Sequence, residues 1–212
     1  MTFRLLALAA SAAFVFAQPA AASVTIGGFT FDDNAFADAL TASSGSYSTF
    51  GGDLATVLTD TDPGTYAFSF SSGAFVTLAF TDNVAINGAG ADIALFELGV
   101  PDPLQVTING ITLTFPTLST GANAGGFSLN AATFDLSLFG IASGASITSL
   151  TLAFPENGGT LASTSLVGAL NSAAAGGGGG VPEPSTWGML IGGVGMAGGA
   201  LRRRTRTALR LA

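Results

Sequence analysis

The feature that most constrains the fold of this chain is a repeated alternation of apolar and polar residues within short segments. Alternation with a period of two is typical of β-strands that bury one face. Glycine, asparagine, aspartate and serine separate these segments at short intervals, as they do in β-sandwiches. We therefore expect strands at residues 24–31, 66–70, 75–80, 93–98, 105–108, 111–115 and 147–154.

Helical periodicity is brief by comparison and is confined to residues 34–40 and 134–139. Asn109 and Gly110 separate two of the expected strands, and this dipeptide strongly favours a two-residue hairpin turn. The sequence thus predicts an all-β fold, an antiparallel β-sandwich of the jelly-roll type. An N-terminal signal peptide and a short C-terminal hydrophobic helix are expected to flank it.

Charge is distributed very unevenly along the chain. Residues 23–180 contain ten aspartates and two glutamates but no cation, so their formal charge is −12. Lysine, histidine and cysteine are absent, and the only basic residues are Arg4, Arg202, Arg203, Arg204, Arg206 and Arg210. A domain without cations cannot neutralise phosphates, so we expect no nucleic-acid partner. The composition also excludes Ser-His-Asp, Cys-His and Schiff-base catalysis, and we expect no enzymatic activity.

The first 22 residues have the features of a secretory signal peptide. Arg4 precedes an apolar run over residues 5–17, and small residues follow at Ala20 and Ala22. The run is short for a membrane span of roughly 30 Å. We expect signal peptidase to cleave after Ala22 and to leave Ser23 as the first mature residue.

Residues 181–206 contain three elements in a fixed order. Pro182, Glu183 and Pro184 form a stiff, extended tripeptide. An uncharged stretch of 15 residues follows at 187–201, which begins with Trp187 and reaches about 22 Å as a helix at 1.5 Å per residue. The cluster at 202–206, which includes Arg202, Arg203 and Arg204, is expected to stay on the cytoplasmic side.

This tail resembles the PEP-CTERM sorting signal of Gram-negative bacteria. The resemblance implies that an exosortase, a membrane protease, recognises Pro182, Glu183 and Pro184 and processes the protein for the cell surface or an exopolysaccharide matrix. The segment 187–201 would then cross the membrane only transiently. A permanent single-pass anchor is the alternative.

Between the two ends we expect a sandwich domain at residues 23–171 and a flexible, alanine- and glycine-rich linker at 172–180. Residues 88–99 and 166–171 are similar to segments of PEP-CTERM surface proteins with discoidin-like or galactose-binding-like sandwiches. In those proteins acidic residues often precede the last strand, whereas this chain has serine and threonine at 163–165.

Calcium is the one cofactor that the residues suggest. Asp82, Asn87 and Asp92 lie in one turn-rich segment, and their side-chain oxygens are ligands that calcium prefers. The segment at 60–64 begins like a calcium-binding loop but lacks the later glycine and glutamate. Ordinary turns rich in aspartate and glycine are the alternative for both segments.

Two functions remain open for the domain. One is a structural or adhesive role in the envelope or extracellular matrix. The other is a carbohydrate-binding module for the cell's own exopolysaccharide. The exposure of Tyr47, Tyr66 and the phenylalanines decides between them, because a sugar-binding surface requires accessible aromatic rings.

Overall fold

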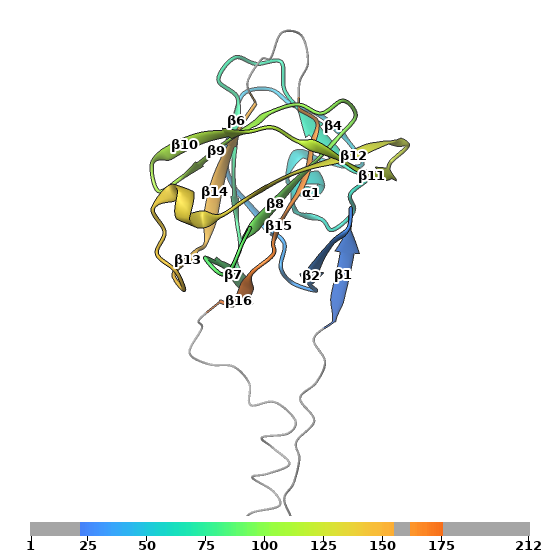
Figure 1. Ribbon diagram of the computed structural model, residues 1–212. Helices are drawn as coiled ribbons and strands as arrows, with labels where there is room; N and C mark the ends of the chain where they lie inside the picture. Colours follow the sequence, from blue (N-terminus) through green and yellow to red (C-terminus); the bar gives the residue numbers. More distant parts are fainter. Residues whose placement is uncertain (1–21, 155–161, 176–212) are drawn as a thin grey trace, which may run out of the picture. The chain divides into compact units, whose positions relative to one another are not determined.

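The computed structural model describes residues 22–154 and 162–175, and these form a sandwich of antiparallel sheets (Figure 1). Its strands are β1 (Ser23–Ile26), β2 (Phe29–Asp32), β3 (Ala39–Ser44), β4 (Ser48–Phe50), β5 (Tyr66–Phe68), β6 (Phe75–Ala79), β7 (Asn83–Ile86), β8 (Ile93–Leu98), β9 (Leu104–Ile108), β10 (Ile111–Phe115), β11 (Leu118–Ala124), β12 (Phe127–Phe134), β13 (Ser146–Ile147), β14 (Ser149–Ala153), β15 (Thr164–Ala169) and β16 (Ser172–Ala174). The helices are α1 (Leu54–Thr59) and the 3₁₀ helix η1 (Leu136–Phe139).

Two large sheets form the layers of the sandwich. One has the strand order β10-β9-β14-β6-β3, and the other has the order β11-β12-β8-β15-β5-β4. The connections β8–β9, β10–β11 and β14–β15 each pass from one sheet to the other, as connections do in jelly rolls. The predicted antiparallel β-sandwich is confirmed.

The main core lies between these two sheets. Val76, Leu78, Val106 and Leu152 come from the five-stranded sheet, and residues such as Leu95 come from the six-stranded sheet. Burial of such apolar side chains is the main favourable term available to a domain without salt bridges. The inward residues of these strands alternate with less buried ones, as in Phe75–Ala79 and Leu104–Ile108.

The outer face of the six-stranded sheet is also covered. Phe96 of β8 faces away from the main core and packs in a second cluster with Phe31 of β2 and Phe36. Every residue of β8 is consequently buried. Burial on both faces explains why β8 is almost continuously apolar, and it makes Glu97 the exception within that strand.

The hairpin that covers this face differs from the single strand expected at 24–31. The chain turns at Gly27 and Gly28, with φ of 57° and 87°, and Ile26 pairs with Phe29. Positive φ at both central residues is the signature of a tight hairpin turn, and glycine adopts it without steric cost. The two glycines shift the apolar–polar alternation by one residue, because Val24 and Ile26 precede them and Phe29 and Phe31 follow. This shift and the Gly-Gly pair are a hairpin signal that the single-strand interpretation overlooked.

The hairpin predicted at Asn109 and Gly110 is confirmed. Ile108 pairs with Ile111 across Asn109 and Gly110, which have φ of 51° and 76°. Asn109 is the one non-glycine residue with positive φ among the described residues.

The two helical predictions had different outcomes. The helix expected at 34–40 is wrong, because the backbone there bonds to neighbouring strands: Ala37 N–H donates to Val167 O and Asp38 N–H donates to Ala79 O. The prediction at 134–139 is partly confirmed by η1. Helix α1 was not predicted; Asp53 caps it by accepting a 2.8 Å hydrogen bond from Thr56 N–H.

The predicted boundary between domain and linker also needs correction. Residues 172–174, which were assigned to the linker, form β16 and pair with β7, and Ala175 N–H donates to Asp82 O. The compact unit accordingly extends to Ala175. Alanine and serine have a low intrinsic preference for β-strands. Residues 172–174 form a strand because they pair with the edge of β7.

Candidate functional site

A row of aromatic rings lies at the β4–β5 edge of the six-stranded sheet. Tyr66, Phe68 and Phe70 alternate with the buried Ala67 and Ser69, so their side chains share the outer face. Phe50 of β4 pairs directly with Tyr66, and Phe127 begins β12. We call these five residues the aromatic row: Phe50, Tyr66, Phe68, Phe70 and Phe127.

The rings of the aromatic row contact one another in sequence. Phe50 stacks on Tyr66 at 5.5 Å between centroids, and Tyr66 stacks on Phe68 at 6.3 Å. Phe127 meets Tyr66 edge-on at 5.9 Å. Phe70 is 73% exposed, Phe50 55% and Phe127 45%. Mutual contacts constrain the ring orientations, and Phe50, Phe70 and Phe127 remain substantially exposed.

A surface depression of about 260 Å³ adjoins the aromatic row. Tyr66 and Phe127 form part of its wall, and polar groups come from Asp102 and Ser163. The remaining lining residues are Leu98, Gly99 and Val100, at the end of β8. The depression therefore combines aromatic surface with a few hydrogen-bonding groups, the usual composition of a small-ligand site.

A buried polar cluster lies next to this depression, on the inward face of the sheet. Glu97 is fully buried, and its Oε1 accepts hydrogen bonds from Thr117 Oγ1 at 2.5 Å, Asp102 N–H at 2.8 Å and Asn130 Nδ2 at 3.2 Å. Burial raises the pKa of Glu97 to about 7, although these hydrogen bonds act in the opposite direction. Its Oε2 has no hydrogen-bond partner in the described structure.

The three residues predicted to bind calcium do not converge. Asp82 is exposed and precedes β7, whereas Asn87 follows it, so about 16 Å of extended chain separates them at about 3.3 Å per residue. Asp92 is fully buried, and its carboxylate accepts hydrogen bonds from Gly88 N–H, Leu136 N–H and Asn171 Nδ2. The structure therefore uses Asp92 to join backbone segments.

The loop at 60–64 also behaves as a turn. Asp60 follows the last residue of α1 and accepts hydrogen bonds from Asp62 N–H and Thr65 Oγ1. Asp62 accepts one from Gly64 N–H at 2.8 Å. Within residues 22–154 and 162–175, no three acidic side chains gather closely enough to hold a metal ion by themselves.

Most of the predicted processing residues lie outside the described residues. This applies to Ala20 and to Pro182, Glu183, Pro184, Trp187, Arg202, Arg203 and Arg204. Ser23, the expected first mature residue, begins β1. In the described part of the chain no helix has both the length and the apolarity to cross a membrane, and the segment 187–201 lies outside that part.

Comparison with known proteins concerns the tail. Residues 180–204 match the PEP-CTERM protein-sorting motif, over nearly the same residues as the predicted signal at 181–206. The chain carries a PEP-CTERM sorting motif. The motif indicates an exported protein that is sorted to the cell surface by an exosortase-dependent route.

No curated protein and no solved structure matches the chain significantly. The expected similarity to discoidin-like or galactose-binding-like sandwiches is therefore not confirmed. The assignment of the fold as a β-sandwich is based on the strand pairing described above.

Sequence reasoning missed the two features that stand out in the domain. The aromatic row was detectable in part, because Tyr66, Phe68 and Phe70 alternate with small residues and so share one face of a strand. The cluster around Glu97 was not detectable, since its members come from segments that are distant along the chain. Only the pairing of β8 with β12 and β15 brings them together.

Proposed function

We propose that the domain binds neutral polysaccharide at the cell surface through the aromatic row, and that this gives the protein an adhesive role in the matrix. The exposure of Phe50, Phe70 and Phe127 is the observation that carries the proposal. Contiguous exposed apolar surface on a soluble domain usually marks an interaction site. Of the two functions that the sequence left open, accessible aromatic rings favour carbohydrate binding.

The chemistry of the row suits a sugar. A pyranose ring presents one face rich in C–H bonds, whose partial positive charge is attracted to the negative face of an aromatic ring. Phe50, Tyr66 and Phe68 stack with interplanar angles of 19° and 25°, and the exposed Phe50, Phe70 and Phe127 lie along this stack as contact surface for a polymer. Asp102 and Ser163 in the adjoining depression can accept hydrogen bonds from sugar hydroxyls.

The charge of the domain selects among polysaccharides. Residues 23–180 carry a formal charge of −12 without any cation. An anionic polymer would be repelled, and no arginine or lysine of the domain could pair with its carboxylate or sulfate groups. A neutral polymer meets no such repulsion.

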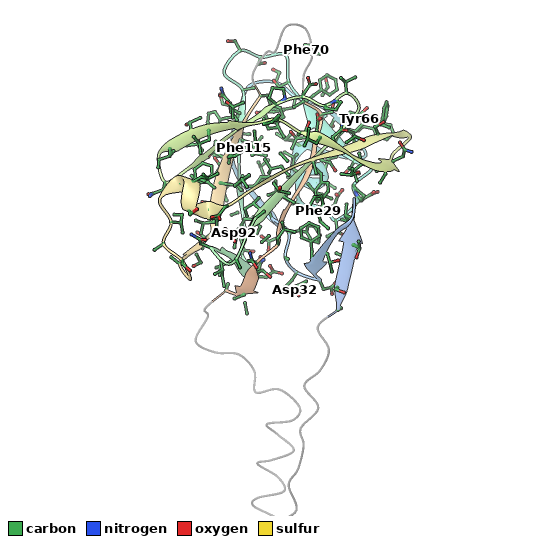
Figure 2. All side chains as sticks on the ribbon, in the orientation of Figure 1. Phe29, Asp32, Tyr66, Phe70, Asp92 and Phe115 are labelled. Atoms are coloured by element: carbon green, nitrogen blue, oxygen red, sulfur yellow. The ribbon has the colours of Figure 1, made fainter. Side chains whose placement is uncertain are left out.

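The aromatic row and the last described strand lie at different ends of the domain. Tyr66 and Phe70 lie toward the end of the domain opposite β16, after which the chain continues toward the sorting motif (Figure 2). A polymer bound there would approach the domain from the side away from the last described strand.

The processing route forms part of the same proposal. Signal peptidase would remove residues 1–22, and the segment 187–201 would hold the protein in the inner membrane of a Gram-negative bacterium. An exosortase would then recognise Pro182, Glu183 and Pro184 and release the domain to the surface or the exopolysaccharide matrix. The match at 180–204 supports this sequence of events.

Affinity electrophoresis tests the binding proposal. The folded protein should migrate more slowly in gels that contain neutral glucans or galactans. Phe127→Ala and Phe70→Ala should each raise the dissociation constant about tenfold, which corresponds to about 1.4 kcal/mol. Leu138→Ala is the matched control, because Leu138 is 54% exposed but lies on η1, outside the aromatic row.

Three results would contradict the proposal. One is unchanged binding in the two phenylalanine variants, and another is equal retardation by anionic polysaccharides. The third is the absence of retardation together with a dimer that Phe127→Ala dissociates, since the row would then be an interface between two copies of the chain.

A further inference from the structure

Three buried side-chain oxygens without hydrogen-bond partners lie on neighbouring strands of the six-stranded sheet. They are Oε2 of Glu97 on β8, Oδ1 of Asn130 on β12 and Oγ1 of Thr164 on β15. Asn130 and Thr164 are the direct cross-strand partners of Glu97, one on each side. Directly paired residues point to the same face with Cβ atoms about 5 Å apart. The three oxygens therefore gather around Glu97.

Such a group of oxygens is costly when it lacks a partner. All three residues are fully buried, and a buried polar atom without a partner costs about 1–3 kcal/mol, and more when it is charged. The domain contains no lysine, arginine or histidine that could compensate the carboxylate. All three unpartnered oxygens can act as acceptors, so one bound cation would satisfy them together.

Hydrogen bonds orient Glu97 for such a ligand. Its Oε1 accepts all three donors, from Thr117, Asn130 and the backbone of Asp102. These bonds fix the carboxylate and leave Oε2 free. Asp102 lines the surface depression and its backbone N–H donates to Glu97, so this residue lies between the depression and the cluster.

We infer that this cluster binds one divalent cation of the calcium type, through side-chain oxygens of Glu97, Asp102, Asn130 and Thr164. Carboxylate, amide and hydroxyl oxygens are hard ligands, which suit calcium better than zinc or copper. The site has only two carboxylates and is completed by neutral groups. It is distinct from the Asp82–Asn87–Asp92 set that the sequence suggested.

The inference does not depend on polysaccharide binding. The cation would link β8, β12 and β15 behind the depression, and would stabilise the domain whether or not a sugar is present. Because a cation that binds only the folded state raises stability, its removal should lower the melting temperature.

Calorimetry and thermal melting test the inference on the full chain in mild detergent. After treatment with chelator, titration with calcium chloride at constant ionic strength should show one bound ion per chain and a rise in melting temperature. Magnesium at the same concentration should have a smaller effect, because it requires a smaller and more regular oxygen shell. Glu97→Gln should abolish the bound ion and the temperature shift.

Further variants make the test decisive. Thr164→Val removes one ligand with little change of shape, and it should weaken calcium binding at least tenfold even if Glu97→Gln fails to fold. Asp82→Asn is the matched control, and it should leave calcium binding unchanged. The inference would be overturned if the melting temperature were the same in calcium and in chelator. It would also be overturned if Thr164→Val bound calcium as the wild type does, or if Asp82→Asn no longer bound it. None of these results would affect the polysaccharide proposal.

Discussion

The buried carboxylate of Asp92 links distant segments of this domain by hydrogen bonds. Asp92 accepts hydrogen bonds from Gly88 N–H at 2.7 Å, Leu136 N–H at 2.8 Å and Asn171 Nδ2 at 2.7 Å. It thus connects the loop before β8 to η1 and to Asn171, the residue directly before β16. In a domain without cations, backbone and amide N–H groups take the place that arginine and lysine usually have beside a buried carboxylate.

This role predicts the effect of Asp92→Asn. An amide in place of the carboxylate directs its NH₂ group toward an N–H donor, so at least one hydrogen bond is lost. We expect the free energy of unfolding to fall by about 1–3 kcal/mol. Urea denaturation should show the same loss in calcium and in chelator, whereas the exposed control Asp82→Asn should change stability little. A loss that vanishes in chelator would instead identify Asp92 as a calcium ligand.

At the scale of elements, the hairpin of β1 and β2 depends on the absence of a side chain on β15. An ideal Cβ at Gly168 would lie 2.5 Å and 2.8 Å from ring carbons of Phe31 and 3.1 Å from Phe36. Phe31 is 1% exposed and also contacts Phe96 of β8 at 6.0 Å between ring centroids. Gly168 therefore allows the hairpin to cover the outer face of the sheet.

Gly168→Ala tests this contact. Because the ring of Phe31 is rigid and enclosed, we expect overpacking to cost about 1–3 kcal/mol of unfolding free energy. A double-mutant cycle with Phe31→Leu provides the control, since the smaller side chain should relieve part of the cost and make the two changes non-additive. Strict additivity in denaturant unfolding would show that Phe31 and Gly168 are not in contact.

At the scale of the whole molecule, the compact domain ends at Ala175, and the sorting motif at 180–204 follows it in the sequence. Residues that direct export are therefore distinct from those that stabilise the sandwich. Changes in the motif should alter the destination of the protein without altering the fold of its domain.

Replacement of Pro182, Glu183 and Pro184 by alanine separates the two roles. We expect the domain to fold normally but to remain in the membrane fraction, with its C-terminal arginines attached. Cell fractionation and mass spectrometry of the mature protein measure both properties. Thr205→Ala with Thr207→Ala lies outside the matched motif and should be released as the wild type is. Normal release of the triple variant would show that the tripeptide is not recognised.

Some features followed from the sequence because they depend on local interactions. The Asn109–Gly110 turn needs only the backbone freedom of two residues, and the sorting motif is contiguous in the chain. Strand segments 93–98 and 111–115 were predicted with their observed bounds, the first from a short apolar run and the second from its alternation, and both signals are local. Local signals were also misleading where backbone groups bond to distant strands, as at 34–40.

The sequence alone therefore determined that the domain forms strands, that the domain contains no cation to pair with its carboxylates, and that the tail carries a sorting motif. Tertiary structure decided which strands are neighbours. The pairing of β8 with β12 and β15 surrounds Glu97 with unpartnered oxygens, and the pairing of β4 with β5 brings Phe50 onto Tyr66. Such pairings are set by packing between segments far apart in sequence, and no local periodicity encodes them.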